Sequence, residues 1–155
     1  MKLSNISNKK GSYAAVTFDK DTEYNITELQ NDIGIPTLDG DDLHSTVMYS
    51  TDHIPEYEEL GDIDPAWTGQ FSHYEKFGED KDVLVLIYNC PELTSRWETL
   101  KSYGAKWDFP DFQAHITLAY DAAEINIDEL RPYKGPINII SEYGEDLDLD
   151  WEDGK

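Results

Sequence analysis

Two pairs of residues, each a histidine and a threonine separated by one position, are the part of this chain best suited to chemistry. The pairs are His44 with Thr46 and His115 with Thr117, and each lies in an apolar run. Alternate residues of a strand project to the same face. We therefore predict two strands, each presenting one imidazole and one hydroxyl to the same side. This pattern uses two of the chain's 4 histidines.

Two imidazoles and two hydroxyls around one cavity could cleave a phosphodiester without a metal ion. Imidazole titrates near neutrality, so a neutral histidine can take a proton from the nucleophile while a charged one gives a proton to the leaving oxygen. The hydroxyls would donate hydrogen bonds to the nonbridging phosphate oxygens. Either pair alone is equally well explained by a core histidine beside a threonine, which strands favour. Two matched pairs favour an active site.

The segments that lead into the two histidines follow one order, which is a strand, a helix, a glycine and a loop. They are residues 13–18, residues 22–33 and Gly34 in the first half, and residues 83–88, residues 92–103 after Pro91 and Gly104 in the second. Glycine just past a helix and proline in its first turn are common stop and start signals. The chain therefore predicts an internal duplication, with strand–helix–strand halves over about 12–50 and 82–121.

The remaining patterns predict three more strands. Residues 67–77 would pair with residues 83–88 through a turn at 78–82, residues 137–140 would form a last strand, and residues 147–151 would form an edge strand or a closing flap. A chain of 155 residues can bury a core as one domain. We expect a single α+β domain over residues 1–155, with antiparallel sheets and a C-terminal strand and flap within 136–155.

The charge of the chain limits its partners. With 33 acidic and 12 basic residues the formal net charge is −21. Such a surface repels long nucleic acid, because contacts from Lys and Arg to phosphate dominate that affinity. A small anionic ligand remains compatible with a locally basic pocket. The acidic stretches, residues 39–42, 56–64 and 142–153, are interpreted as solvated loops, with mimicry of a DNA phosphate row as the alternative.

Several kinds of site and location are not supported. The single cysteine, Cys90, excludes an internal disulfide and multi-cysteine metal sites, and we expect it to be a half-buried structural thiol. No histidine has a partner at metal-ligand spacing, so no metal and no cofactor are expected, and His53 and His73 are interpreted as surface residues. The start of the chain is polar and no apolar run could span a membrane, which predicts a soluble intracellular protein.

Ligand-binding residues can be proposed from their places beside the strands. Tyr13 opens the first strand, where its ring could stack on a base, or it could be an ordinary rim tyrosine. Lys106 and Trp107 flank the second histidine strand and could hold phosphate and base. Their alternative is a surface lysine and a packing tryptophan. Trp97 lies on the apolar face of the second helix and is expected in the core.

The tandem motifs, Leu-His-Ser-Thr-Val at 43–47 and Ala-His-Ile-Thr-Leu at 114–118, resemble the two-histidine phosphoesterase superfamily. The resemblance covers roughly residues 12–141. It implies a bilobal α+β fold with pseudo-twofold symmetry and an active site in the cleft between the lobes. It also implies metal-independent hydrolysis of phosphoesters beside a ribose 2′-hydroxyl.

Within that superfamily, the small size, the acidity and residues 142–151 are similar to the phage anti-CBASS phosphodiesterases, which destroy cyclic di- and trinucleotide messengers of a bacterial immune system. This resemblance implies catalytic roles for His44, Thr46, His115 and Thr117, and base binding by Tyr13, Glu145 and Trp151. It also implies action in the cytoplasm of an infected bacterial host. The chain departs from basic RNA-processing members, since it has only two arginines, and this favours a small cyclic nucleotide over RNA.

Three functions remain open from the sequence. The first is hydrolysis of 3′,5′-linked cyclic di- and trinucleotides to linear products. The second is an acidic DNA mimic or nucleotide-binding inhibitor without catalysis, and the third is a 2′,3′-cyclic phosphodiesterase acting on RNA ends. The sequence decides neither the preferred bases and ring size, nor which histidine is base and which acid, nor the oligomeric state.

Overall fold

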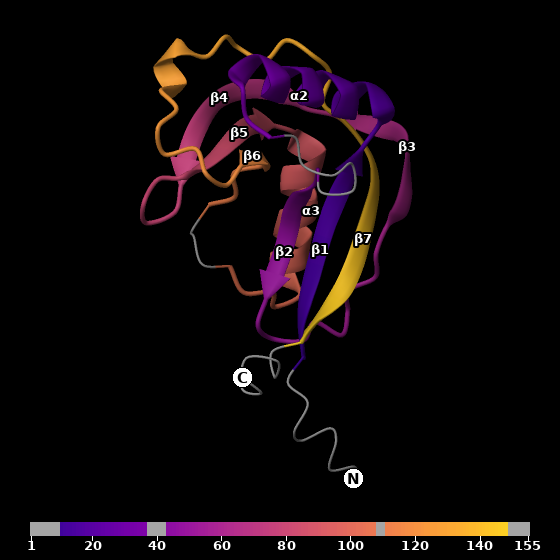
Figure 1. Cartoon of the computed structure of the whole chain (residues 1–155). Coiled ribbons are helices and arrows are strands. Elements are labelled where there is room, and N and C mark those ends of the chain that lie inside the picture. The colour runs from indigo at the N-terminus through magenta and orange to yellow at the C-terminus, as the bar shows by residue number, and fades with distance from the viewer. Residues whose placement is uncertain (1–9, 37–42, 108–110, 149–155) are drawn as a thin grey trace.

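Two antiparallel sheets and two helices make up the computed structural model, which describes residues 10–36, 43–107 and 111–148 (Figure 1). One sheet has the strand order β2-β1-β7-β3, formed by Ser45–Ser50, Lys10–Phe18, Asn138–Asp148 and Gly61–Thr68. The other has the order β4-β5-β6, formed by Gln70–Phe77, Val83–Asn89 and His115–Ala119. The helices are α2 (Lys20–Ile33) and α3 (Pro91–Ser102), with a short 3-10 turn η2 (Ile127–Glu129). This architecture is compatible with the predicted α+β class.

The predicted strand–helix–strand order occurs twice, as β1–α2–β2 and β5–α3–β6. In each half the strand before the helix pairs antiparallel with the strand after it. The predicted start and stop signals hold, because Pro91 opens α3 and Gly34 ends α2 in the left-handed region with φ 86°. Gly104 follows α3 with φ 104°. Only glycine adopts such values without strain.

Each helix is hydrogen-bonded through a side chain to the sheet that contains the strands of the other half. Gln30 of α2 donates from Nε2 to the backbone carbonyl of Leu118 in β6, at 3.0 Å. Arg96 of α3 donates from Nε to Glu142 in β7, at 2.8 Å. Figure 1 shows α2 lying across the β4–β6 side and α3 behind β1 and β2. The two halves therefore share one core, in which Trp97 is buried as predicted.

The acidic stretch 142–153 is not the solvated loop that we predicted. Up to Asp148 it is part of β7, which lies between β1 and β3. Glu142 is 1% exposed and accepts hydrogen bonds from Arg96 and from the Tyr57 hydroxyl. A buried carboxylate is tolerated when it is paired and hydrogen-bonded in this way. Residues 147 and 148 continue this strand instead of beginning a separate one, and residues 149–151 lie outside the described residues.

The predicted strand 67–77 is divided between the two sheets. Trp67 and Thr68 end β3 and pair with β7, whereas residues 70–77 form β4 and pair with β5 as predicted. The chain passes between the sheets at Gly69, where an added Cβ would lie 2.6 Å from the Tyr88 ring. The strand pattern continues through this position, so no local signal marks the crossing.

Cys90 is more deeply buried than predicted. Its exposed fraction is 1%, and it immediately precedes α3. Burial raises the pKa of its thiol, which keeps the thiol neutral. The side chain is therefore an unreactive part of the core.

Candidate active site

The two histidine motifs meet where β2 lies against β6. Ser45, the middle residue of the first motif, donates a hydrogen bond from Oγ to the backbone carbonyl of His115, at 2.6 Å. The charge of His44 also contributes to lowering the pKa of His115, so the two imidazoles are within electrostatic reach of each other. The fold thus brings together two motifs that are far apart in the sequence.

A β-bulge follows each motif at the same position. In the pairing of β1 with β2, Ala14 faces Met48 and Ala15 faces Thr46, so Val47 has no partner. In the pairing of β5 with β6, Leu84 faces Ala119 and Val85 faces Thr117, so Leu118 has no partner. Bulges bend a strand and change the direction of its side chains, and they occur often beside active sites. The two strand–helix–strand halves therefore match in backbone geometry at this position as well.

His115 lies in a partly apolar environment that favours its neutral form. Its ring meets the ring of Phe77 edge-on, with the centroids 5.0 Å apart. Nδ1 is 3.1 Å from the backbone carbonyl of Gln113, which makes Nδ1 the protonated nitrogen and leaves Nε2 as the basic one. Burial is the main cause that lowers the pKa of His115; the hydrogen bond to Gln113 opposes it, the charge of His44 lowers the pKa further, and Glu75 has the smallest, opposing effect. A neutral imidazole with a free Nε2 can act as a general base.

The first motif is hydrogen-bonded to Tyr13, the tyrosine that we predicted to bind a base. The hydroxyl of Tyr13 is 3.0 Å from Oγ1 of Thr46. Burial is the main cause that raises the pKa of Tyr13 to about 12, so the hydroxyl stays protonated and can donate. Glu145 faces Tyr13 across the β1–β7 pair, which places both side chains on one face of the sheet. His44 immediately precedes β2 and is half-buried.

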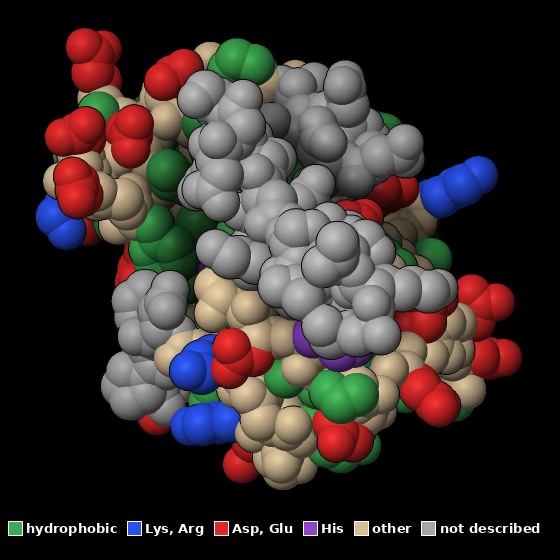
Figure 2. Space-filling model, turned by 90° about the horizontal axis from the view of Figure 1, so that it is seen from below, with side chains coloured by type: hydrophobic (Ala, Val, Ile, Leu, Met, Phe, Trp, Pro, Cys, Tyr) green, Lys and Arg blue, Asp and Glu red, His purple; other side chains and the backbone are tan. Residues whose placement is uncertain are grey.

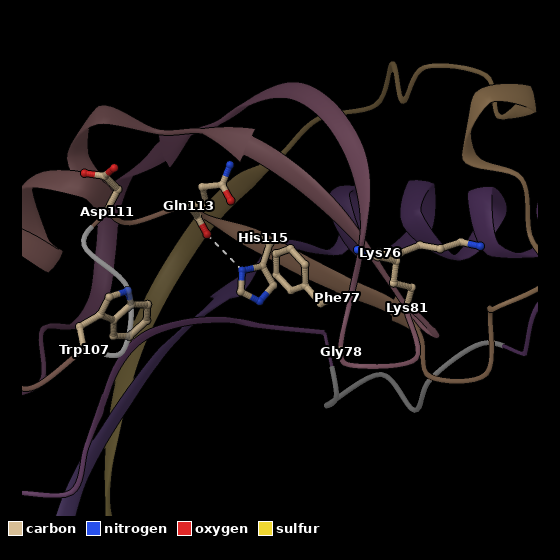
Figure 3. A pocket seen from close by; sticks show the side chains of 8 residues that line it. All are labelled: Lys76, Phe77, Gly78, Lys81, Trp107, Asp111, Gln113 and His115. Carbon is tan, nitrogen blue, oxygen red and sulfur yellow. Dashed lines mark hydrogen bonds between the residues drawn. The ribbon is translucent and has the colours of Figure 1, made fainter.

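A cavity of about 610 Å³ opens beside His115 (Figure 3). Phe77 and Gln113 lie next to the imidazole, and Trp107 lies on the opposite side. This volume is within the range usual for small-molecule sites. Of the predicted residues, His115 and Trp107 line this cavity, whereas Lys106 forms an ion pair with Asp52 at 3.5 Å and is not among the lining residues. Trp151 lies outside the described residues.

Among the described residues, the charged side chains that line the cavity are those of Lys76, Lys81 and Asp111. Figure 2 shows acidic side chains spread around the face seen from below, with few Lys or Arg among them. At the cavity, Nζ of Lys76 donates to the carbonyl of Ala123 at 2.8 Å and is directed away from His115. Lys81, in the turn between β4 and β5 with φ 53°, extends toward Phe77 and His115 (Figure 3). The sequence pattern points to neither lysine, because Lys76 lies within a predicted strand and Lys81 within a polar turn.

The other histidines lie at the surface as predicted. His73 is exposed on β4, with Nε2 2.8 Å from the carboxylate of Glu75. His53 is exposed and lines a second hollow with Glu59 and Glu145. Within 10–36, 43–107 and 111–148, no three His, Cys, Asp or Glu side chains are grouped as a metal site. No helix in the same ranges is long and apolar enough to cross a membrane.

Comparison with known proteins gives one family. The family model described as anti-CBASS protein Acb1 matches residues 10–154. A protein of that name from Acinetobacter phage Ac42 is 37% identical over 153 residues, covering 98% of this chain and 99% of the relative. Relatives of the same name from Vibrio phage KVP40 and Enterobacteria phage T4 are each 30% identical, over 156 and 144 residues, covering 97% and 92% of this chain. They match over 97% and 92% of their own lengths.

Proposed function

Because the chain belongs to the anti-CBASS protein Acb1 family, we propose that it is a metal-independent phosphodiesterase of 3′,5′-linked cyclic di- and trinucleotides. The product would be linear, and the loss of the cyclic messenger would protect a phage in the cytoplasm of its host from CBASS immunity. The observation that carries this proposal is the Ser45–His115 hydrogen bond, which joins two histidine–threonine motifs at one site. An inhibitor that only bound a partner would not need two imidazoles in electrostatic contact.

Each of the four motif residues has a role in the proposed mechanism. His115 is the general base, because burial and the His44 charge favour its neutral form. It takes the proton of the ribose 2′-hydroxyl, which attacks the neighbouring phosphorus. His44 gives a proton to the leaving 5′-oxygen. Thr46 and Thr117 donate hydrogen bonds to the nonbridging oxygens. This step breaks the bond between phosphorus and the 5′-oxygen and leaves a linear product with a 2′,3′-cyclic phosphate end, which water then opens to a terminal monophosphate.

The same reasoning supports membership of the two-histidine phosphoesterase superfamily, with its bilobal arrangement. Two strand–helix–strand halves and a bulge after each motif are what an internal duplication would leave. Base binding is assigned to Tyr13 and Glu145 on one sheet face and to Trp107 in the cavity. Stacking by Trp151, from a C-terminal flap, remains a prediction.

A substrate panel tests the proposal. The protein is incubated with cyclic di- and trinucleotides, with 2′,3′-cyclic mononucleotides and with RNA ending in a 2′,3′-cyclic phosphate, each with and without excess chelator. Linear products from the cyclic oligonucleotides in both conditions support the proposal. Cleavage of the RNA ends alone would favour the RNA-processing alternative, and cleavage of none would favour a non-catalytic binder. Activity lost with chelator and restored by a divalent ion would contradict the mechanism.

The protonation of His115 can be measured without substrate. Since the charge of His44 lowers the pKa of His115, His44→Ala should raise that pKa, as followed by NMR of the imidazole protons. Glu75 acts in the opposite sense, so Glu75→Gln should lower it. In the wild type the value should lie below the ordinary 6.5. An unchanged His115 titration in both variants would mean that the groups are not coupled.

Lys81 should contribute to substrate affinity. Its ammonium extends into the cavity beside His115, where a phosphate of the substrate would lie. We expect Lys81→Met to raise KM for a cyclic dinucleotide roughly 5- to 20-fold, the loss of a charged hydrogen bond, with little change in melting temperature. Lys106→Met is the matched control, since Lys106 pairs with Asp52. Equal KM values for the two variants would remove Lys81 from the site.

A further inference from the structure

One edge of β6 is not paired with another strand in the described residues. β6 pairs with β5 on one side and ends its sheet on the other. The carbonyl of Ala114 accepts from the backbone N–H of Tyr88, so the next carbonyl, that of His115, is directed away from β5. Unpaired backbone carbonyls that are buried need other donors.

Two buried side chains of the first half supply those donors. Ser45 donates to the carbonyl of His115 at 2.6 Å, and Gln30 donates to the carbonyl of Leu118 at 3.0 Å. Leu118 is the bulge residue, which has no partner on β5. The two bonds therefore hold the backbone on either side of Thr117. We call these four groups, the Ser45 and Gln30 side chains with the two carbonyls, the β6 clamp.

Both donors lie in the interior. Ser45 is 1% exposed and Gln30 is 0% exposed. Ser45 Oγ also accepts a hydrogen bond from the hydroxyl of Tyr88 at 2.7 Å, so it has two fixed partners. The amide oxygen of Gln30 has no hydrogen-bond partner among the described residues. A buried amide with an unpaired oxygen costs free energy, so packing alone does not account for a glutamine at this position.

On the basis of the proposed function, we propose that Ser45 and Gln30 are positioning residues, whose hydrogen bonds set the second motif, His115 and Thr117, against the first. Ser45 is covalently part of the first motif, between His44 and Thr46. Its bond to the His115 carbonyl therefore links the two motifs through one side chain. Misplacing a reacting group by about 1 Å can cost 10²-fold in rate, so loss of either bond should act on kcat.

The test compares Ser45→Ala and Gln30→Met with the control Thr22→Val. Thr22 is 0% exposed and lies on the same helix as Gln30, but its hydroxyl accepts from the backbone of Asn138, at the start of β7. We expect both clamp variants to lower kcat for a cyclic dinucleotide roughly 10- to 100-fold, with KM within about twofold. The control should keep the wild-type kcat even if its melting temperature falls as far as that of the clamp variants.

A second variant separates positioning from stability. Ser45→Ala leaves the buried Tyr88 hydroxyl without its partner, and adding Tyr88→Phe removes that hydroxyl. The double variant should regain melting temperature but not kcat. Recovery of both, or a kcat for Ser45→Ala within twofold of the wild type, would overturn the proposal.

Amide hydrogen exchange tests, independently of catalysis, whether the clamp holds β6 in place. Exchange at residues 115–118 should rise in Ser45→Ala and Gln30→Met, measured against Thr22→Val. If the wild type cleaves no cyclic nucleotide, the proposed function fails, and this measurement still reports on the clamp. Unchanged exchange of β6 in both clamp variants would show that the bonds do not hold the strand.

Discussion

Replacing His44 or His115 with alanine is expected to lower kcat/KM for a cyclic dinucleotide roughly 10²–10⁴-fold, which is the usual contribution of one general acid or base. In the proposed mechanism the two imidazoles act on the same phosphodiester, one removing a proton from the attacking hydroxyl and the other supplying one to the leaving oxygen. Residues that act as a unit have non-additive effects. The double variant should therefore be hardly worse than either single variant.

The chain offers a matched control for these substitutions. His73 is an exposed histidine on β4, bonded to Glu75 and placed outside the cavity. His73→Ala should leave kcat/KM within about twofold, and circular dichroism and melting temperature should show all variants folded. Near-normal turnover by a folded His44→Ala or His115→Ala would end the acid–base assignment. A strictly additive double variant would mean that the histidines act in separate steps.

Most of the strands and helices that position the site could be predicted from local sequence. Alternating and helical apolar patterns located β1, α2, β5 and α3, and glycines ended both helices where expected. These signals are local, because each depends on residues within one turn or one strand. The spacing of the motifs predicted two matching halves, and the β2–β6 contact brings the motifs together.

The features that could not be predicted from the sequence depend on partners distant in the chain. Glu142 is buried because Arg96, 46 residues away in sequence, meets its carboxylate. A glutamate in an acidic stretch otherwise indicates solvent exposure. The two bulges are set by the register of neighbouring strands, which no local pattern encodes. The same holds for Ser45 and Gln30, whose acceptors lie on β6.

A cyclic dinucleotide that lacks the 2′-hydroxyl at the cleaved position should resist the proposed cleavage almost completely. The proposed first step uses that hydroxyl as nucleophile, held beside the phosphorus by the ribose itself. Effective molarities of well-oriented intramolecular groups reach 10⁵–10⁸ M, so free water is a poor replacement for it. We expect kcat for the deoxy analogue to fall by at least roughly 10³-fold, near the limit of detection, while its Kd stays close to that of the ribose substrate.

The control is a mixed cyclic dinucleotide in which only one sugar is 2′-deoxy. Cleavage should then occur only at the phosphate beside the remaining ribose, and the position of the break is read from the mass of the linear product. His115 lines the cavity and its Nδ1 is bonded to Gln113, so Nε2 of the same imidazole could instead activate a water molecule. Equal cleavage at both phosphates would require that water mechanism. It would also predict direct formation of a linear phosphate, with no 2′,3′-cyclic intermediate seen in a rapid-quench time course. The nucleophile is therefore decided by two observations that do not depend on each other.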